Sequence, residues 1–235
     1  MGTLLLVRHG QADTSGDTYD KLTPRGVEQA RRLGEFWSAR SMHFDRVYVG
    51  PCQRHEQTFE ALRAAYVAEG RSMPEPRSTE ALDELPAIEL TKRAAPELAL
   101  RDPKVADWLH AIVQGEEAAR ILPRLIEHVT RLYAAGELAI EGLETFRGFR
   151  ERVERWLHDE VLRVARGERI VAFTSGGPVG VAVGCALELT NPKVIDVIGM
   201  VRNTSYSEFR FDARRLSMVS FNAHPHLQDD WLTQI

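Results

Sequence analysis

The sequence predicts an α/β fold, a three-layer sandwich in which a mostly parallel sheet has helices on both faces, together with a helical insert. The main observation is that short apolar runs alternate along the chain with stretches of helical periodicity. A second is that 43% of the 235 residues are hydrophobic, which is enough for a sizeable core. We expect a single domain over residues 1–235, with the insert at about residues 90–142.

Five short segments have the character of strands. The first, TLLLV, is apolar after Thr3, as expected of a strand that is buried on both faces. The second is ended by the pair Gly50-Pro51, which breaks regular structure. The predicted strands are residues 3–7, 46–49, 169–174, 205–211 and 216–221.

The first two helices begin close to recognisable signals. Thr23 is a favourable N-cap and Pro24 a favourable first helical residue. A second helix is predicted over residues 53–68, and Pro74 and Pro76 bracket the loop that follows it. The apolar stripe predicted for the first helix is Val27, Ala30, Leu33, Gly34 and Trp37.

The second half of the chain predicts two further helices around a less regular insert. A long helix is expected over residues 143–166, ended by Gly167, and another from Gly176 to about residue 189. Within the insert, three prolines are expected to break the helices: Pro96, Pro103 and Pro123. The buried stripe predicted for the long helix is Phe146, Phe149, Val153, Trp156 and Leu157.

Composition excludes several classes of function. The 30 basic and 34 acidic residues give a net charge of −4, so there is no global basic surface for nucleic acid. The two cysteines, Cys52 and Cys185, form neither a disulfide framework nor a zinc pattern. The first apolar run is stopped by Arg8-His9, too soon for a signal peptide, and no run approaches a membrane helix. We therefore expect a cytoplasmic protein, and its oligomeric state stays open.

Polar side chains follow three of the predicted strands, where α/β sheets place their binding sites. Arg8 and His9 come directly after the first strand; Arg can bind two phosphate oxygens and a neutral His can act as a nucleophile. Arg54 opens the helix after the second strand, at an N-terminus that favours anions. Ser175 and Gly176 lie at the turn after the third, which again suggests an anion site. Cys52 is interpreted as a packing residue near this site, not as a nucleophile.

At this point the chain resembles the histidine phosphatase superfamily, the phosphoglycerate-mutase-like proteins. The matching elements occur in the order and at the spacing of that family, over about the first 90 residues and residues 144–190. They are LLLVRHG, LTPRGVEQARRLGEF, DRVYVGPCQRHEQTFEAL, LDEL and RIVAFTSGGPVG, with NTSYSEFRF near the end. The insert matches no motif and corresponds to a helical region that varies in the family.

The resemblance implies a role for each matched residue. His9 corresponds to the nucleophile that takes the phosphoryl group, and Arg8 and Arg54 correspond to the two arginines that bind it. Phosphoryl transfer needs positive groups on the nonbridging oxygens, an in-line nucleophile and a proton donor to the leaving group. Two arginines and a helix N-terminus supply the charge, so neither a metal nor another cofactor is expected.

Several acidic residues lie in the part of the sequence that is expected to supply the proton donor. Glu84, in the segment LDEL, corresponds to the family residue that often protonates the leaving group. Asp83, Glu80 and Glu89 lie close by in the sequence, and any of the four could instead be solvated. Catalytic roles are therefore assigned to His9 and Glu84, and phosphate contacts to Arg8, Arg54, Ser175 and Gly176.

Ser175 marks a departure from the family, which normally has a second His before the Gly pair. A Ser can donate one hydrogen bond but carries no charge, and the lost contact is expected to weaken catalysis by about 2–3 kcal/mol, roughly a hundredfold. Three other histidines could take the place: His55, His224 and His226. Replacing Ser175 with His is expected to raise kcat unless one of them already fills the space.

These observations predict a phosphohydrolase that acts on a small phosphomonoester through a phosphohistidine. One alternative is a catalytically impaired protein that binds a phosphorylated ligand or inorganic phosphate. A phosphomutase is a weaker alternative, because residues 11–15 (QADTS) have Ala12 at the position of the Ser in the mutase segment and lack its Trp-Asn pair. The motif His224-Pro225-His226 is insufficient for a metal site.

Overall fold

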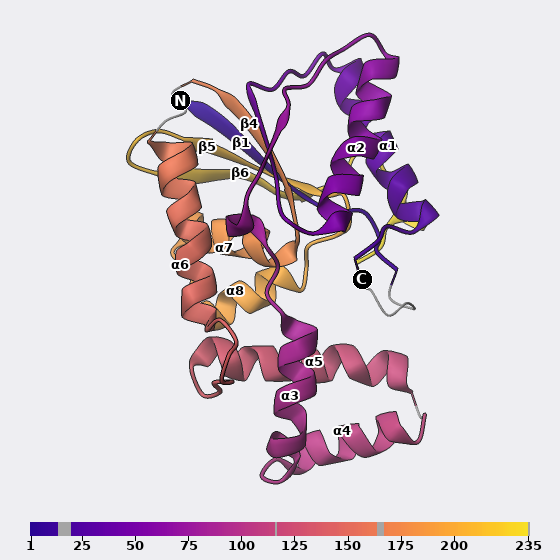
Figure 1. Ribbon diagram of the computed structural model, residues 1–235, viewed down its shortest axis with the longest axis vertical. Helices are drawn as coiled ribbons and strands as arrows, with labels where there is room; N and C mark the ends of the chain where they lie inside the picture. Colours follow the sequence, from indigo (N-terminus) through magenta and orange to yellow (C-terminus); the bar gives the residue numbers. More distant parts are fainter. Residues whose placement is uncertain (14–19, 116, 164–166, 235) are drawn as a thin grey trace.

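The computed structural model describes residues 1–13, 20–115, 117–163 and 167–234. Its sheet contains six strands in the order β3-β2-β4-β1-β5-β6 (Figure 1). The four strands β3, β2, β4 and β1 are parallel to one another, and β5 and β6 continue the sheet in antiparallel pairing. The strands are β1 (Gly2–Arg8), β2 (Arg46–Val49), β3 (Pro76–Ser78), β4 (Arg169–Thr174), β5 (Tyr206–Phe211) and β6 (Leu216–Ala223). The predicted fold class, a mostly parallel sheet between helices, is confirmed.

Helices cover both faces of the sheet, and β1 shows how the sequence divides between them. Its side chains alternate between two apolar clusters, with Leu4 and Leu6 in one and Leu5 and Val7 in the other. The second cluster also holds α1 (Pro24–Ala39) and α2 (Gln53–Ala68). On the other face lie α6 (Phe146–Trp156), α7 (Gly176–Leu187) and α8 (Asn191–Ile198) (Figure 1).

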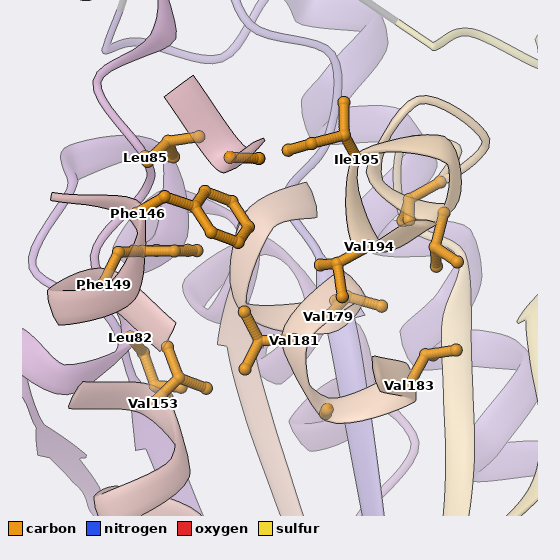
Figure 2. Packing of buried hydrophobic residues seen from close by; sticks show 14 of the residues in the cluster. Leu82, Leu85, Phe146, Phe149, Val153, Val179, Val181, Val183, Val194 and Ile195 are labelled. Carbon is orange, nitrogen blue, oxygen red and sulfur yellow. The ribbon is translucent and has the colours of Figure 1, made fainter. Parts of the chain in front are cut away.

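The helices α6 and α7 pack through side chains of the first cluster. Figure 2 shows Phe146 and Phe149 of α6 facing Val179 and Val181 of α7. The predicted long helix is shorter at its start, because Thr145 caps α6, and it continues into a π-helical turn, η2 (Leu157–Leu162). Its predicted last residues, 164–166, lie outside the described part of the chain.

The insert contains α3 (Ala87–Ala99), α4 (Pro103–Val113) and α5 (Ala118–Ala135), which project below the sheet in Figure 1. The expectation for Pro103 was correct, since it is the first residue of α4. The expectations for Pro96 and Pro123 were wrong, because both lie inside helices. Burial of one apolar side of each helix, for example Val129 and Tyr133 of α5, outweighs the hydrogen bond that each proline removes.

Smaller differences from the prediction follow from tertiary contacts. In α1 Val27 is exposed, while Gln29 is buried and the rest of the predicted stripe packs as expected. Trp37 and Trp156 are core residues, as predicted. Neither β3 nor α8 was predicted, because both are short and depend on neighbouring elements. Within the described residues, no helix is long and apolar enough to cross a membrane.

Candidate functional site

The pairing of β1, β2 and β4 brings the segments that follow these strands to one edge of the sheet. Arg8 is paired with Thr174, and the N–H of His9 donates to the carbonyl of Thr174 at 2.8 Å. The N–H of Gly50 donates in the same way to the carbonyl of Phe173, at 2.9 Å. The three polar clusters predicted after the strands therefore meet at this edge.

His9 lies in this site as a buried, neutral imidazole. Its Nδ1–H donates to the carbonyl of Gly10 at 2.7 Å, so Nε2 carries the lone pair. Burial, followed by the charges of Arg8 and Arg54, holds the pKa of His9 well below its ordinary value of 6.5. An uncharged imidazole with a free Nε2 is the form that can act as a nucleophile.

The backbone at the end of β1 is fixed by contacts that the sequence did not predict. The side-chain N–H of Asn203 donates to the carbonyl of His9 at 3.1 Å, and the N–H of Thr204 donates to the same oxygen at 3.2 Å. Both residues are buried. They are the first two residues of the motif NTSYSEFRF, and a short motif does not indicate which strand it will contact.

Two buried arginines flank the turn after β4. The Arg8 guanidinium lies beside Gly176, where an added Cβ would be 4.0 Å from Nε of Arg8. The Nη2 of Arg54 donates to Oγ of Ser175 at 3.2 Å. Arg8 and Arg54 are 9% and 6% exposed, so both cations are largely removed from water. A buried pair of cations of this kind is suited to a doubly charged anion.

Asp20 is a member of the site that the sequence did not reveal. Its Oδ1 pairs with Nη1 of Arg54 at 3.0 Å, and its Oδ2 accepts the N–H of Gln53 at 3.0 Å. The carboxylate thus caps the first turn of α2 and holds the neighbouring Arg54. The contact spans 34 residues of sequence, so no local pattern could have indicated it.

Glu84 reaches the turn after β4 from the other side. Its Oε1 accepts the N–H of Gly177 at 3.0 Å and that of Leu85 at 2.8 Å. Burial raises the pKa of Glu84 above its ordinary value of 4.5, although Arg54 and these hydrogen bonds oppose the shift. A carboxyl that holds its proton more readily is suited to act as a general acid.

The segment around Glu84 is anchored firmly. Leu82 and Leu85 on either side are buried in the cluster that contains α6 (Figure 2), and the hydroxyl of Thr174 donates to the carbonyl of Leu82 at 2.7 Å. A Cβ at Gly177 would lie 2.2 Å from Oε1 of Glu84, so this close approach requires glycine. The other acidic candidates differ: Glu80 and Glu89 are exposed, and Asp83 accepts from Sγ of Cys52 at 3.2 Å.

Cys52 is held as a thiol. Burial, together with the neighbouring Asp83, raises its pKa to about 12, although the charge of Arg54 opposes this. A thiol that is rarely ionised at neutral pH is a poor nucleophile. This agrees with the interpretation of Cys52 as a packing residue. Among the described residues, no group of three or more His, Cys, Asp or Glu side chains is arranged to hold a metal ion.

The three candidate histidines differ in what they contact in the structure. His55 is fully buried, and its Nε2 lies 2.6 Å from Oγ of Ser175. His226 instead contacts Oγ1 of Thr204 at 3.0 Å, and Nδ1 of His224 contacts the carbonyl of Asn222 at 2.8 Å. In the described part of the chain, His55 is the one candidate that touches Ser175.

Comparison with protein families gives one match. The family model of the histidine phosphatase superfamily (branch 1) matches residues 4–224. A search of curated proteins finds no match.

Solved structures with the same fold include proteins of different activity. A phosphoserine phosphatase variant from Entamoeba histolytica, in complex with phosphoserine, is 20% identical, with a TM-score of 0.62 over 97% of this chain and 100% of the other. A phosphoglycerate mutase from Bacillus anthracis is 17% identical, with a TM-score of 0.64 over 95% and 94%. A mycobacterial glucosyl-3-phosphoglycerate phosphatase is 18% identical, with a TM-score of 0.61 over 94% and 98%. At 17–20% identity, the similarity to these structures shows the fold alone.

Proposed function

The chain belongs to the histidine phosphatase superfamily, and from this premise we propose that it hydrolyses a small phosphomonoester through a phosphorylated His9. The observation that carries the proposal is the state of His9: a neutral imidazole with Nδ1 tied to Gly10, next to two buried arginines. Such a group combines a nucleophile with positive charge for the phosphoryl oxygens. Membership of the superfamily supports phosphoryl transfer in general, and hydrolysis is the finer proposal.

In the first step, Nε2 of His9 attacks phosphorus. The N–P bond forms as the bond between phosphorus and the ester oxygen breaks, and the electron pair of that bond goes to the leaving oxygen. Glu84 donates its proton to this oxygen, so the product leaves as a neutral alcohol. Arg8, Arg54 and the Ser175 hydroxyl bind the nonbridging oxygens, which gather charge in the transition state.

In the second step, water replaces His9 on phosphorus. The ionised Glu84 takes a proton from the water as its oxygen attacks, and the electron pair of the N–P bond returns to Nε2. Inorganic phosphate leaves, and both His9 and Glu84 return to their starting forms. The positive charge is supplied by Arg8 and Arg54, and the proposal includes neither a metal nor another cofactor.

The leaving group is proposed to be a small molecule. Two of the solved relatives are named as phosphatases, and one of these holds phosphoserine. The insert formed by α3, α4 and α5 is proposed as a variable part of one histidine-phosphatase-like domain, on the side where the leaving group would lie. The weaker mutase alternative rested on residues 11–15, of which 14 and 15 lie outside the described part of the chain.

A second candidate function is favoured by Ser175. A side chain without charge at this place could leave a site that binds phosphate but turns over slowly, which is the behaviour of a phosphate-binding protein. Both candidates share the anion site, and they differ in whether His9 becomes phosphorylated.

The test is hydrolysis of p-nitrophenyl phosphate by the purified protein, with acid-labile phosphate incorporation measured alongside. We expect turnover and labelling by the wild type, and loss of both in His9→Ala, with the exposed His158→Ala as the control. Phosphate binding without labelling or turnover would favour the binding protein. Equal turnover by His9→Ala would refute the role of His9.

A further inference from the structure

The hydroxyl of Ser175 is held by two side chains of α2. Nε2 of His55 lies 2.6 Å from Oγ, and Nη2 of Arg54 donates to the same oxygen at 3.2 Å. Ser175 occupies the N-cap position of α7, yet within the described residues its side chain makes no cap hydrogen bond to that helix. A Ser at an N-cap normally bonds to the first turn, so this hydroxyl is committed to other partners.

A second observation shows that the position of His55 is built into the packing. His55 and Ser175 are both fully buried. A Cβ at residue 50 would lie 2.4 Å from Nδ1 of His55, so the imidazole fits only because Gly50 is present. Residues that follow β2 and β4 are thus fitted to one another, and the small Ser leaves the space that the His55 ring approaches.

We propose that His55 and Ser175 together replace a single phosphate-contacting histidine. Nδ1 of His55 is buried and has no hydrogen-bond partner among the described residues, so the proposal places the proton of the neutral imidazole on Nε2. Nε2–H of His55 and Nη2–H of Arg54 then donate to the two lone pairs of Oγ, which leaves the Ser175 O–H to donate to a phosphate oxygen. Ser175 contacts the substrate, and His55 is a positioning residue that acts through it. The inference rests on the proposed function and assigns this role to a residue that the family motif leaves open.

The surroundings of His55 fix the character of this donor chain. The groups that face it are Arg54 from its own helix, Ser175 from the turn after β4, and His9 from the end of β1, with ring centroids 5.8 Å apart. Burial, followed by the charge of Arg54, lowers the pKa of His55 to about 3. Its imidazole is therefore neutral at physiological pH, and it orients the hydroxyl without adding a charge.

The experiment removes the side chain of His55 and places a histidine at residue 175, separately and together. Inorganic phosphate binding by calorimetry and kcat on p-nitrophenyl phosphate are measured for His55→Ala, Ser175→His and the double variant, with His224→Ala as the control. We expect His55→Ala to weaken phosphate binding roughly five- to tenfold, the size of one hydrogen bond. Ser175→His should also bind more weakly, because the new ring meets His55.

The double variant is the decisive protein. Removing the His55 ring makes room for a histidine at residue 175, so the double variant should bind phosphate more tightly than either single variant. Additive losses, or unchanged binding by His55→Ala, would overturn the proposal. His55→Gln retains an N–H donor and should keep more affinity than His55→Ala; equal losses in these two folded variants would also overturn it.

Failure of this proposal can be told apart from failure of the proposed function. The coupling between residues 55 and 175 is measured in phosphate affinity, which does not require turnover. Absence of His9 phosphorylation would refute the hydrolase mechanism while the coupling could still be measured. Thermal unfolding midpoints of every variant establish that the affinities refer to folded protein.

Discussion

Glu84→Gln tests the chemistry of the site with little change to its geometry. Oε1 of Glu84 accepts from the N–H groups of Gly177 and Leu85, at 3.0 and 2.8 Å. The amide oxygen of Gln can accept both bonds, so the side chain should stay in place. What is lost is the transferable proton, since an amide N–H does not ionise in this pH range.

The size of the effect depends on the leaving group. General acid catalysis contributes about a hundredfold to ten-thousandfold where the leaving oxygen is a strong base, as in an alkyl phosphate. The leaving group of p-nitrophenyl phosphate is a weak base that needs little protonation, so its hydrolysis should fall by less than about tenfold. We therefore expect Glu84→Gln to lower kcat/KM for an alkyl phosphate at least about tenfold more than for the aryl ester.

The assay compares kcat/KM for the two esters in the wild type, Glu84→Gln and the exposed Glu80→Gln. The last variant removes a nearby acidic group whose side chain is exposed, and both of its rates should match the wild type. An equal loss on both esters in Glu84→Gln would refute the role of proton donor. A selective loss in Asp83→Asn instead would assign the proton to Asp83.

Three further predictions follow from the contacts of the site. The pKa of Glu84 is raised, so alkyl phosphatase activity should fall as the pH rises through that pKa and the carboxyl loses its proton. The pKa of His9 is lowered, so His9 stays neutral to well below pH 6.5. Glu84→Gln should therefore remove the alkaline limb of the kcat/KM profile for the alkyl phosphate. Gly177→Ala puts a Cβ 2.2 Å from Oε1 of Glu84, so it should lower both the unfolding midpoint and the alkyl phosphatase rate. Gly176→Ala is the control. A Cβ at residue 176 meets its nearest neighbour at 3.6 Å, so this variant should unfold close to the wild-type temperature. Asp20→Asn keeps an oxygen for the first turn of α2 but removes a negative charge from the site, so inorganic phosphate should bind severalfold more tightly by calorimetry.

Sequence reasoning succeeded where the signal is local. Thr23 was predicted to cap α1, and its side chain accepts the N–H of Gly26. The bounds predicted for β2, α2 and β4 match the structure. The apolar run of β2 ends before Gly50 and that of β4 before Ser175, and α2 begins with polar residues. Pro96 and Pro123 misled for the opposite reason: the cost of a proline in a helix is fixed locally, but the packing that outweighs it is tertiary.

The residues of the candidate site lie in local motifs, whereas the contacts between them are long-range. His9, Arg54 and Glu84 belong to motifs a few residues long, so their types and order could be found in the sequence. The contact between His55 and Ser175 joins residues 120 positions apart, and that between Asp20 and Arg54 joins residues 34 apart. Nothing in either short segment says which partner it meets. The sequence therefore indicated which residues to consider for the candidate site, but not the hydrogen bonds that link them.

The register of β1 against β4 determines whether those components can act together. Arg8 opposite Thr174 puts His9 next to Ser175, and this pairing is fixed by packing on both faces of the sheet. Leu4 and Leu6 face one cluster while Leu5 and Val7 face the other, so a shift of one residue would exchange the two sets and draw Arg8 into the sheet. The apolar residues of β1 thus hold His9, the proposed nucleophile, at a fixed separation from the turn at Ser175 and Gly176 that is proposed to bind phosphate.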